Sequence, residues 1–254
     1  LRKVSLKSIG LIIVAAIFLF IMADYVNACS MIAFQNLLDD SLQAIVNKPV
    51  EALVVVAILP AIIEEFLFRG MIYRGIANKS NKKIVIIISA LLFAFLHMNF
   101  NQMCYAFVMG LVFAIVIYLT DNLSVSILLH MLFNAFTVII TCFEKSNAIQ
   151  AILQCNIAGY TLFNPSLTDT QGKIEISLLI IGGLIAILSA VIAGWLILLI
   201  AKTEKTTETT INNENILKDN DNIFKNNENW KPDFRFFAGS GVCILIAILY
   251  EILL

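Results

Sequence analysis

The sequence predicts an all-α protein, a polytopic membrane bundle of about seven transmembrane helices with its functional residues buried in the core. Of its 254 residues, 60% are hydrophobic and only 14% are charged, whereas about a quarter of the residues in a soluble domain are charged. Several apolar runs approach the ~20 residues that a helix needs to cross a ~30 Å hydrocarbon core. Open sheets would leave backbone N–H and C=O groups at their edges without hydrogen bonds in lipid. The runs are also too long and too uniformly apolar for the strands of a membrane barrel.

Seven apolar runs supply the predicted membrane spans. They cover about 8–26, 50–73, 84–100, 102–120, 123–142, 176–201 and 236–254. Segment 30–47 is too polar to span, but its apolar residues recur at helical spacing, which predicts a helix lying in the membrane interface. Residues 143–175 form a longer polar connection between the fifth and sixth spans.

Composition divides the chain into three parts. Residues 1–201 form the predicted membrane-embedded domain, and its functional core covers about 50–142. Residues 202–235 are rich in Asn, Lys, Glu and Thr, which predicts a flexible polar linker on the cytoplasmic side. Residues 236–254 then form a C-terminal transmembrane helix on that tether.

Lysine and arginine set the predicted orientation. If the N-terminus lies in the cytoplasm, most of these residues fall on the cytoplasmic side and three, Lys48, Lys145 and Lys173, fall outside. The positive-inside rule therefore predicts a multi-pass protein of the plasma membrane with a cytoplasmic N-terminus. The first span begins like a signal peptide, but six further spans follow, which favours an anchor. No basic patch indicates nucleic acid as a partner.

The second span contains the stretch PAIIEEFLFRGMIY, which places two glutamates and an arginine among apolar residues. Unpaired, these three charges would cost on the order of 8–10 kcal/mol in the membrane. Glu65 and Arg69 are i,i+4 neighbours that can pair on one helix face, whereas Glu64 lies about 100° around the helix. This pattern predicts an ion pair and a separate carboxylate available as a general base. Pro60 frees a backbone carbonyl near Val56, which predicts a bend around a cavity.

Both histidines of the chain lie in apolar spans, His97 in FAFLHMNF and His130 in LLHMLFNAF. Asn134 follows His130 by four residues, so amide and imidazole project from one helix face. The polar residues of these three spans are all unfavourable in lipid, and turning them inward onto one wet cavity lets them satisfy one another. The candidate site residues are Glu64, Glu65, Arg69, His97, His130 and Asn134.

A carboxylate and imidazoles that face a buried water indicate hydrolysis, by one of two routes. In the first, Glu64 and His97 deprotonate a water that attacks a peptide carbonyl, and His130 and Asn134 donate hydrogen bonds to the oxyanion. In the second, Glu64, His97 and His130 bind zinc, and the metal activates the water. The usual HExxH pair of zinc proteases is absent, and the sequence leaves both routes open.

Three motifs carry a resemblance to a known family. EEFLFRG, FAFLH and HMLFN, in this order within about residues 50–142, are similar to the EExxxRG, FxxxH and HxxxN signatures of the CaaX protease and bacteriocin-processing membrane family. The resemblance implies an intramembrane endopeptidase, of glutamate type or zinc-dependent. It also implies that Glu64 and His97 activate water, that Glu65 and Arg69 form a supporting pair, and that His130 and Asn134 form the oxyanion site.

The expected substrate is a membrane-associated or lipidated peptide or protein within the bilayer. The Asn-, Ile- and Lys-rich composition indicates a bacterial source, where prenylated CaaX proteins are not expected. Two alternatives stay open. One is a proton-coupled transporter, because intramembrane Glu, His and Arg also mark proton relays. The other is a non-catalytic bacteriocin-immunity or scaffold protein that keeps the polar core for structure.

Overall fold

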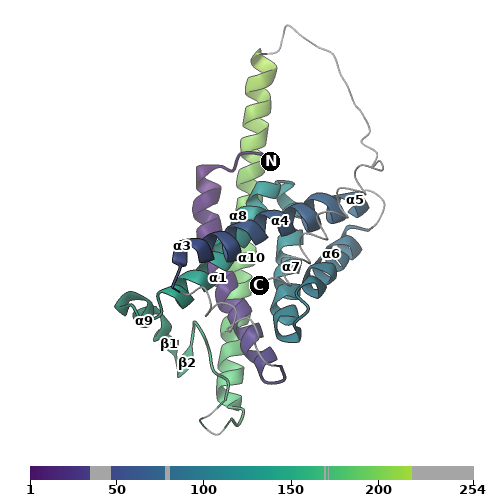
Figure 1. The fold of residues 1–254 in the computed structure, drawn as a ribbon. Coiled ribbons are helices and arrows are strands. Elements are labelled where there is room, and N and C mark those ends of the chain that lie inside the picture. The colour runs from purple at the N-terminus through teal and green to yellow at the C-terminus, as the bar shows by residue number, and fades with distance from the viewer. Residues whose placement is uncertain (35–46, 78–80, 169, 171, 219–254) are drawn as a thin grey trace.

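A computed structural model describes residues 1–34, 47–77, 81–168, 170 and 172–218 as an all-α membrane bundle (Figure 1). Four of the described helices are long and apolar enough to cross a membrane. They are α1 (Leu6–Met31), α7 (Phe100–Thr120), α8 (Leu123–Cys142) and α10 over Ile176–Thr207. The predicted span 236–254 and most of the predicted interfacial segment 30–47 lie outside the described residues.

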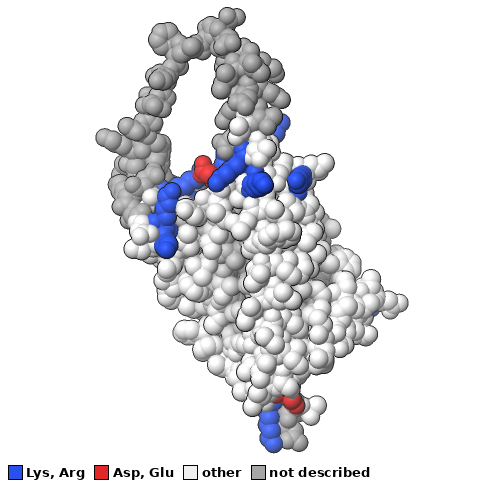
Figure 2. Space-filling view, turned by 180° about the vertical axis from the view of Figure 1, so that it is seen from behind, with Lys and Arg blue, Asp and Glu red and all other residues white. Residues whose placement is uncertain are grey.

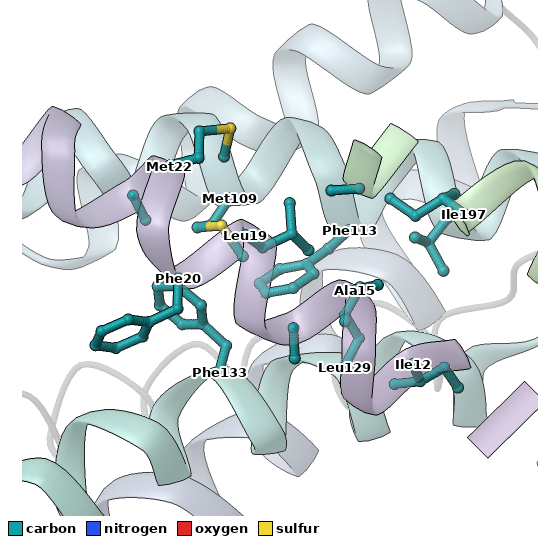
Figure 3. Packing of buried hydrophobic residues seen from close by; sticks show 14 of the residues in the cluster. Ile12, Ala15, Leu19, Phe20, Met22, Met109, Phe113, Leu129, Phe133 and Ile197 are labelled. Carbon is teal, nitrogen blue, oxygen red and sulfur yellow. The ribbon is translucent and has the colours of Figure 1, made fainter. Parts of the chain in front are cut away.

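Helix α1 is at the centre of the hydrophobic core and lies beside α10 along the length of the bundle (Figure 1). Its apolar side chains meet those of α7, α8 and α10 in one cluster of buried residues (Figure 3). Leu19, Phe113 and Leu129, from α1, α7 and α8, are almost completely buried there. The core thus fixes α7 and α8, which carry part of the candidate site.

The predicted second span is a continuous helix of changing pitch that runs obliquely across the bundle (Figure 1). It comprises α3 (Pro49–Ala52), the π-helical segment η1 (Leu53–Ile58), α4 (Leu59–Glu65), the π-helical segment η2 (Phe66–Tyr73) and α5 (Arg74–Ala77). Pro60 lacks an N–H and its ring crowds the carbonyl four residues earlier, so the helix widens before it. The predicted irregularity at Pro60 therefore takes the form of a π-helical turn.

Helix α6 (Lys82–Leu96) is shorter than the predicted span 84–100. It ends at His97, and Met98 then takes a left-handed backbone conformation with φ of 48°. Asn99 caps the following α7, because its side chain accepts a hydrogen bond from the Asn101 N–H. His97 consequently lies at a helix end rather than within a span, which corrects the prediction.

The polar connection after α8 folds against the end of α1. It contains α9 (Asn147–Leu153) and a hairpin of two short antiparallel strands, β1 (Asn156–Ile157) and β2 (Tyr160–Thr161), in which Asn156 pairs with Thr161. The Tyr160 ring packs against Gly182 of α10, where a Cβ would come within 2.4 Å of it. Because Gly182 has no side chain, the Tyr160 ring of the hairpin packs directly against α10.

Helix α10 continues to Lys218, whereas the sequence predicts a flexible linker from residue 202. Several threonines of this stretch donate their hydroxyls to carbonyls one turn back in the helix, as Thr203 does to Leu199 and Thr206 to Lys202. These bonds satisfy the hydroxyls of those threonines within the helix itself. Residues 202–218 are therefore helical where the sequence predicts a flexible segment, and the remainder of the predicted linker, 219–235, lies outside the described residues.

Most of the charged side chains on the face shown gather near the end of the molecule where the N-terminus lies, a smaller group lies at the opposite end, and the middle of the surface is free of them (Figure 2). At that end Arg2 and Arg74 both contact Asp121, at the turn between α7 and α8. Buried Glu204 of α10 accepts hydrogen bonds from the Ser5 N–H and from the Asn122 amide. These contacts bring the start of the chain, residue 74 and residue 204 to the same end of the molecule, and the predicted cytoplasmic orientation of that end stays a prediction.

Candidate active site

Helix α8 presents one stripe of polar residues to the oblique helix. Ser126, His130 and Asn134 follow one another at intervals of four residues, which places them on one helix face. Ser126 and His130 contact Glu65, and Asn134 contacts the backbone of η1. This stripe joins the first and third of the predicted motifs in one polar cluster inside an apolar bundle.

Glu65 is the centre of this cluster and is completely buried. Its Oε1 accepts a hydrogen bond from Arg69 Nη1 at 2.9 Å and lies 3.1 Å from His130 Nδ1. Its Oε2 accepts from the Ser126 hydroxyl at 2.6 Å. The predicted i,i+4 ion pair between Glu65 and Arg69 is confirmed, and its burial on both sides means that each charge depends on the other.

His130 lies between the two glutamates. Its Nδ1 faces Glu65, and its Nε2 lies 3.9 Å from Oε2 of Glu64. Because the ion-paired Glu65 carboxylate can only accept, His130 Nδ1 carries a proton and donates it. The ring stacks on Phe113, with centroids 4.6 Å apart and planes at 21°, which fixes its orientation.

His97 approaches this cluster from the end of α6. Its Nδ1 lies 3.0 Å from the carbonyl of Phe93, which can only accept, so the other ring nitrogen, Nε2, carries the lone pair in the neutral ring. The Phe93 ring lies 5.1 Å from the His97 ring and 5.7 Å from the His130 ring. Phe93 thus packs between the two imidazoles, which belong to different motifs.

Asn134 donates a hydrogen bond to the Val56 carbonyl, to which Pro60 cannot donate because it lacks an N–H. Its Nδ2 donates to the carbonyl of Val56 at 3.1 Å, so the predicted free carbonyl at this position has a side-chain partner. One amide hydrogen of Asn134 is thereby used in joining α8 to η1. The second amide hydrogen is the one that is left for a ligand.

Arg69 is held by more than its ion pair. Its Nη2 donates to the carbonyl of Gly110 at 2.9 Å, and its guanidinium carbon lies 4.5 Å from the Phe93 ring centroid and 5.3 Å from that of Phe113. Such cation–π contacts contribute up to about 2 kcal/mol each when desolvated. The guanidinium therefore ties the oblique helix to α6 and α7.

Gly110 lets α6 and α7 approach closely at this point, and its replacement by alanine is expected to be disruptive. A Cβ at Gly110 would lie 3.0 Å from Ala90 Cα and 3.2 Å from Ala90 Cβ. We expect Gly110→Ala to lower the free energy of unfolding by about 1–3 kcal/mol, the usual range for overpacking. Thermal unfolding in detergent, followed by circular dichroism, measures the change.

Gly194→Ala is the matched control for this variant, because a Cβ at Gly194 of α10 meets nothing within 4 Å. It should unfold at the wild-type temperature or slightly above it, since alanine favours the helix. Equal unfolding temperatures for the two variants would contradict a tight contact between α6 and α7.

The structure joins four of the six predicted site residues directly, namely Glu64, Glu65, Arg69 and His130. His97 is linked to them through Phe93, and Asn134 through the same stripe of α8. Sequence reasoning missed Ser126, Phe113 and Gly110. A signal existed for Ser126, which is a small polar residue one turn before His130 in an apolar span.

A metal site was the open alternative for Glu64, His97 and His130. Over residues 1–34, 47–77, 81–168, 170 and 172–218, no three or more His, Cys, Asp and Glu side chains are grouped so that they could hold a metal ion. His130 faces Glu65 with its Nδ1 and Glu64 with its Nε2, and a histidine whose one ring nitrogen contacts a carboxylate can ligate a metal through the other. The zinc route therefore stays a prediction beside the metal-free one.

Comparison with known proteins gives two matches. Residues 46–136 match the family model described as type II CAAX prenyl endopeptidase Rce1-like. The membrane-embedded CAAX protease MroQ of Staphylococcus aureus (strain USA300) is 34% identical over 116 residues, which cover 43% of this chain and 47% of that protein. The chain thus matches about half the length of this relative. No solved structure matches the chain.

The matched region contains the entire oblique helix, the α6–α7 turn and the α8 stripe with His130 and Asn134. Residues 46–136 thus resemble the Rce1-like type II CAAX prenyl endopeptidases, and this match, together with the similarity to MroQ, supports a place for the chain in the wider CaaX protease family.

Proposed function

We propose that this protein is an intramembrane endopeptidase that hydrolyses a peptide bond with a water activated by Glu64. One observation carries the proposal. An imidazole, that of His130, lies 3.1 Å from one carboxylate and 3.9 Å from another, and all three side chains are buried within an apolar helical bundle. Ionisable groups are costly in the membrane, and their presence there indicates a functional site; the family match supports hydrolysis as that function.

The charges of the cluster support a proton on His130. Glu64 and Glu65 carry two negative charges, and Arg69 carries one positive charge. A net charge of −1 buried among apolar residues is costly. His130 is the group that lies between both carboxylates. In the proposal it carries a further proton as Nε2–H and serves as a donor, while Glu64 acts as the base.

The two histidines therefore take complementary roles in the proposal. His97 has Nε2 as an acceptor, because its Nδ1 donates to the Phe93 carbonyl. It orients the attacking water and assists Glu64. His130 donates from Nε2 to the oxyanion, and the second amide hydrogen of Asn134 adds a donor. Each such donor contributes about 2.7–4 kcal/mol to transition-state stabilisation.

The reaction then follows with its protons balanced. Glu64 takes a proton from water, and the resulting hydroxide attacks the peptide carbonyl carbon. The carbonyl oxygen becomes an oxyanion that His130 and Asn134 stabilise. As the C–N bond breaks, Glu64 returns the proton to the leaving amine, and the acid product retains the hydroxide oxygen.

The proposed mechanism uses protein groups and water, so chelators are expected to leave the rate unchanged. The purified protein in detergent is incubated with EDTA or 1,10-phenanthroline and assayed against a cleaved peptide. Rates within about twofold of the untreated protein are expected, since no tightly bound ion takes part. A loss of activity that added zinc restores would contradict this metal-free mechanism and favour the zinc route.

The proposed substrate is a membrane-anchored peptide or protein, and the charged end of the bundle is the cytoplasmic one. The contacts of Arg2 and Arg74 at that end support the orientation, following the positive-inside rule. The plasma membrane of a bacterium is the proposed location. Bacteriocin maturation is one process in which such a protease would act.

A comparison of membrane peptides tests the proposed function. Membranes with the wild-type protein are compared with membranes that contain Glu64→Gln at the same level, by quantitative peptidomics. New peptide termini that occur only with the wild type are expected. If no terminus differs while the two proteins accumulate equally, the protein is not a protease. A transporter would then be sought by proton uptake into vesicles.

A further inference from the structure

We propose that Ser126 is a positioning residue that holds the Glu65 carboxylate, and through it the His130 imidazole, in the reactive arrangement. The catalytic consequence of this proposal rests on the proposed function, whereas its structural part does not. Ser126 is completely buried on α8, and its hydroxyl lies 2.6 Å from Glu65 Oε2. The serine lies outside all three sequence motifs.

The hydroxyl of Ser126 is used differently from most others in these helices. Thr120, Thr203 and Thr206 each donate to a carbonyl four residues earlier in their own helix, which is the usual way to satisfy such a group. Ser126 instead donates across the helix interface to a carboxylate. Its second contact, with the Phe113 carbonyl, is long at 3.5 Å, so the bond to Glu65 is the dominant one.

This bond determines how the two oxygens of Glu65 are shared. Oε1 serves both Arg69 Nη1 and His130 Nδ1, while Oε2 is turned to Ser126. A guanidinium favours two parallel hydrogen bonds to one carboxylate. Arg69 makes only one such bond here and directs its Nη2 to the Gly110 carbonyl. Ser126 therefore keeps Oε2 away from the guanidinium and leaves Oε1 within reach of His130.

Removal of the hydroxyl has a defined consequence. Without it, Glu65 is free to rotate about its terminal bond and to pair with Arg69 through both oxygens. The hydrogen bond to His130 Nδ1 then lengthens or breaks, and ring contacts with Phe113 and Phe93 remain to hold the imidazole. The Nε2 of His130 would no longer be fixed toward Glu64.

Nuclear magnetic resonance of labelled histidine tests the structural part without any substrate. The chain has two histidines, so ¹⁵N-histidine labelling in detergent gives two ring systems, and the His97→Gln variant identifies that of His130. We expect Ser126→Ala to shift the Nδ1–H resonances of His130. Ser126→Thr, which keeps the hydroxyl, should retain the wild-type shifts. Ser126→Cys, a weaker donor of similar size, should fall between them and substitutes for the alanine variant if that variant does not fold.

Ser89→Ala is the matched control. Ser89 is also buried, but its hydroxyl donates to the Phe68 backbone carbonyl at 3.3 Å rather than to a carboxylate. This variant should leave the His130 resonances in place. Unchanged His130 resonances in Ser126→Ala and in Ser126→Cys, or equal shifts in Ser89→Ala, would overturn the proposal.

Kinetics test the catalytic part with a synthetic copy of a peptide cleaved in the membrane comparison. Ser126→Ala should lower kcat about 10- to 100-fold, on the scale of a lost hydrogen bond to a charged group, and leave KM within about twofold. Ser126→Thr should recover the rate. A normal kcat in Ser126→Ala would overturn the positioning role even if the protease activity itself is established. If the wild type cleaves nothing, the proposed function fails, while the resonance test still decides the structural role.

Discussion

Replacing Arg69 with methionine is expected to prevent stable folding. The Glu65 carboxylate has no exposed surface, and Arg69 is its counter-charge at 2.9 Å. Removing one partner of a buried ion pair typically destabilises a protein by about 3–5 kcal/mol, because the other charge is left uncompensated. Loss of the bond to the Gly110 carbonyl and of the contact with the Phe93 ring adds to this. The yield of monodisperse protein in detergent and its unfolding temperature measure the effect.

A double variant that also removes the charge of Glu65 is the decisive comparison for Arg69→Met. In Glu65→Gln/Arg69→Met both charges are absent, so the double variant should recover much of the stability that Arg69→Met loses. Arg74→Met is the matched surface control, because Arg74 pairs with exposed Asp121 and such pairs contribute about 0–1 kcal/mol. Normal stability of the single Arg69→Met variant would show that Glu65 is not charged in the folded protein.

Replacing Glu64 with glutamine is expected to abolish hydrolysis and leave the fold intact. Glutamine has nearly the same shape but cannot take a proton from water, and general-base catalysis typically contributes about 10²- to 10⁴-fold. We expect kcat to fall by at least that factor with a wild-type unfolding temperature. Cleavage of a synthetic peptide by the purified protein, with product termini identified by mass spectrometry, measures the rate.

Glu51→Gln serves as the control for this variant, since Glu51 is exposed and pairs with Lys48 at the start of the oblique helix. It should retain full activity. Should Glu64→Gln and His97→Ala both keep the wild-type rate, the cluster would have a structural role only. Bacteriocin immunity that survives in both variants would then favour the scaffold alternative.

The elements that could be predicted from sequence are those set by local spacing. The pairing of Glu65 with Arg69 follows from four residues along one helix, and the shared face of His130 and Asn134 follows from the same interval. Both arrangements are found. The apolar runs also located α7 and α8 to within two residues at each end, because long uniform runs leave little choice of boundary.

The contacts between helices could not be predicted in this way. Which carboxylate faces His130 Nδ1, and that Asn134 meets the Val56 carbonyl, depends on how α8 is set against the oblique helix. The spacing of residues within one span does not show how far α8 is shifted or rotated relative to the oblique helix. Ser126 was missed for the same reason, since only its distance to Glu65 distinguishes it from an ordinary serine in an apolar helix.

Helix ends were the other source of error. His97 falls at the end of α6 because Met98 adopts a left-handed conformation and Asn99 begins the next helix, and neither residue interrupts the apolar pattern enough to reveal this. In α10 the reverse holds. A polar composition indicates a linker, but the helix continues to Lys218, and the hydroxyls of Thr203 and Thr206 bond to carbonyls one turn back.

The two π-helical segments, η1 and η2, enclose the two glutamates at the end of α4. A π-helical turn is wider than an α-helical turn because it holds an extra residue. A single deletion in η1 would therefore tighten that segment and rotate the residues before it about the helix axis, while Glu64 and Glu65 keep their register with α8. The Val56 carbonyl of η1 accepts a hydrogen bond from Asn134, so the same deletion would move that carbonyl relative to α8. One residue more or less before Pro60 thus changes how the Asn134 amide is held, while the glutamates keep their place on α4.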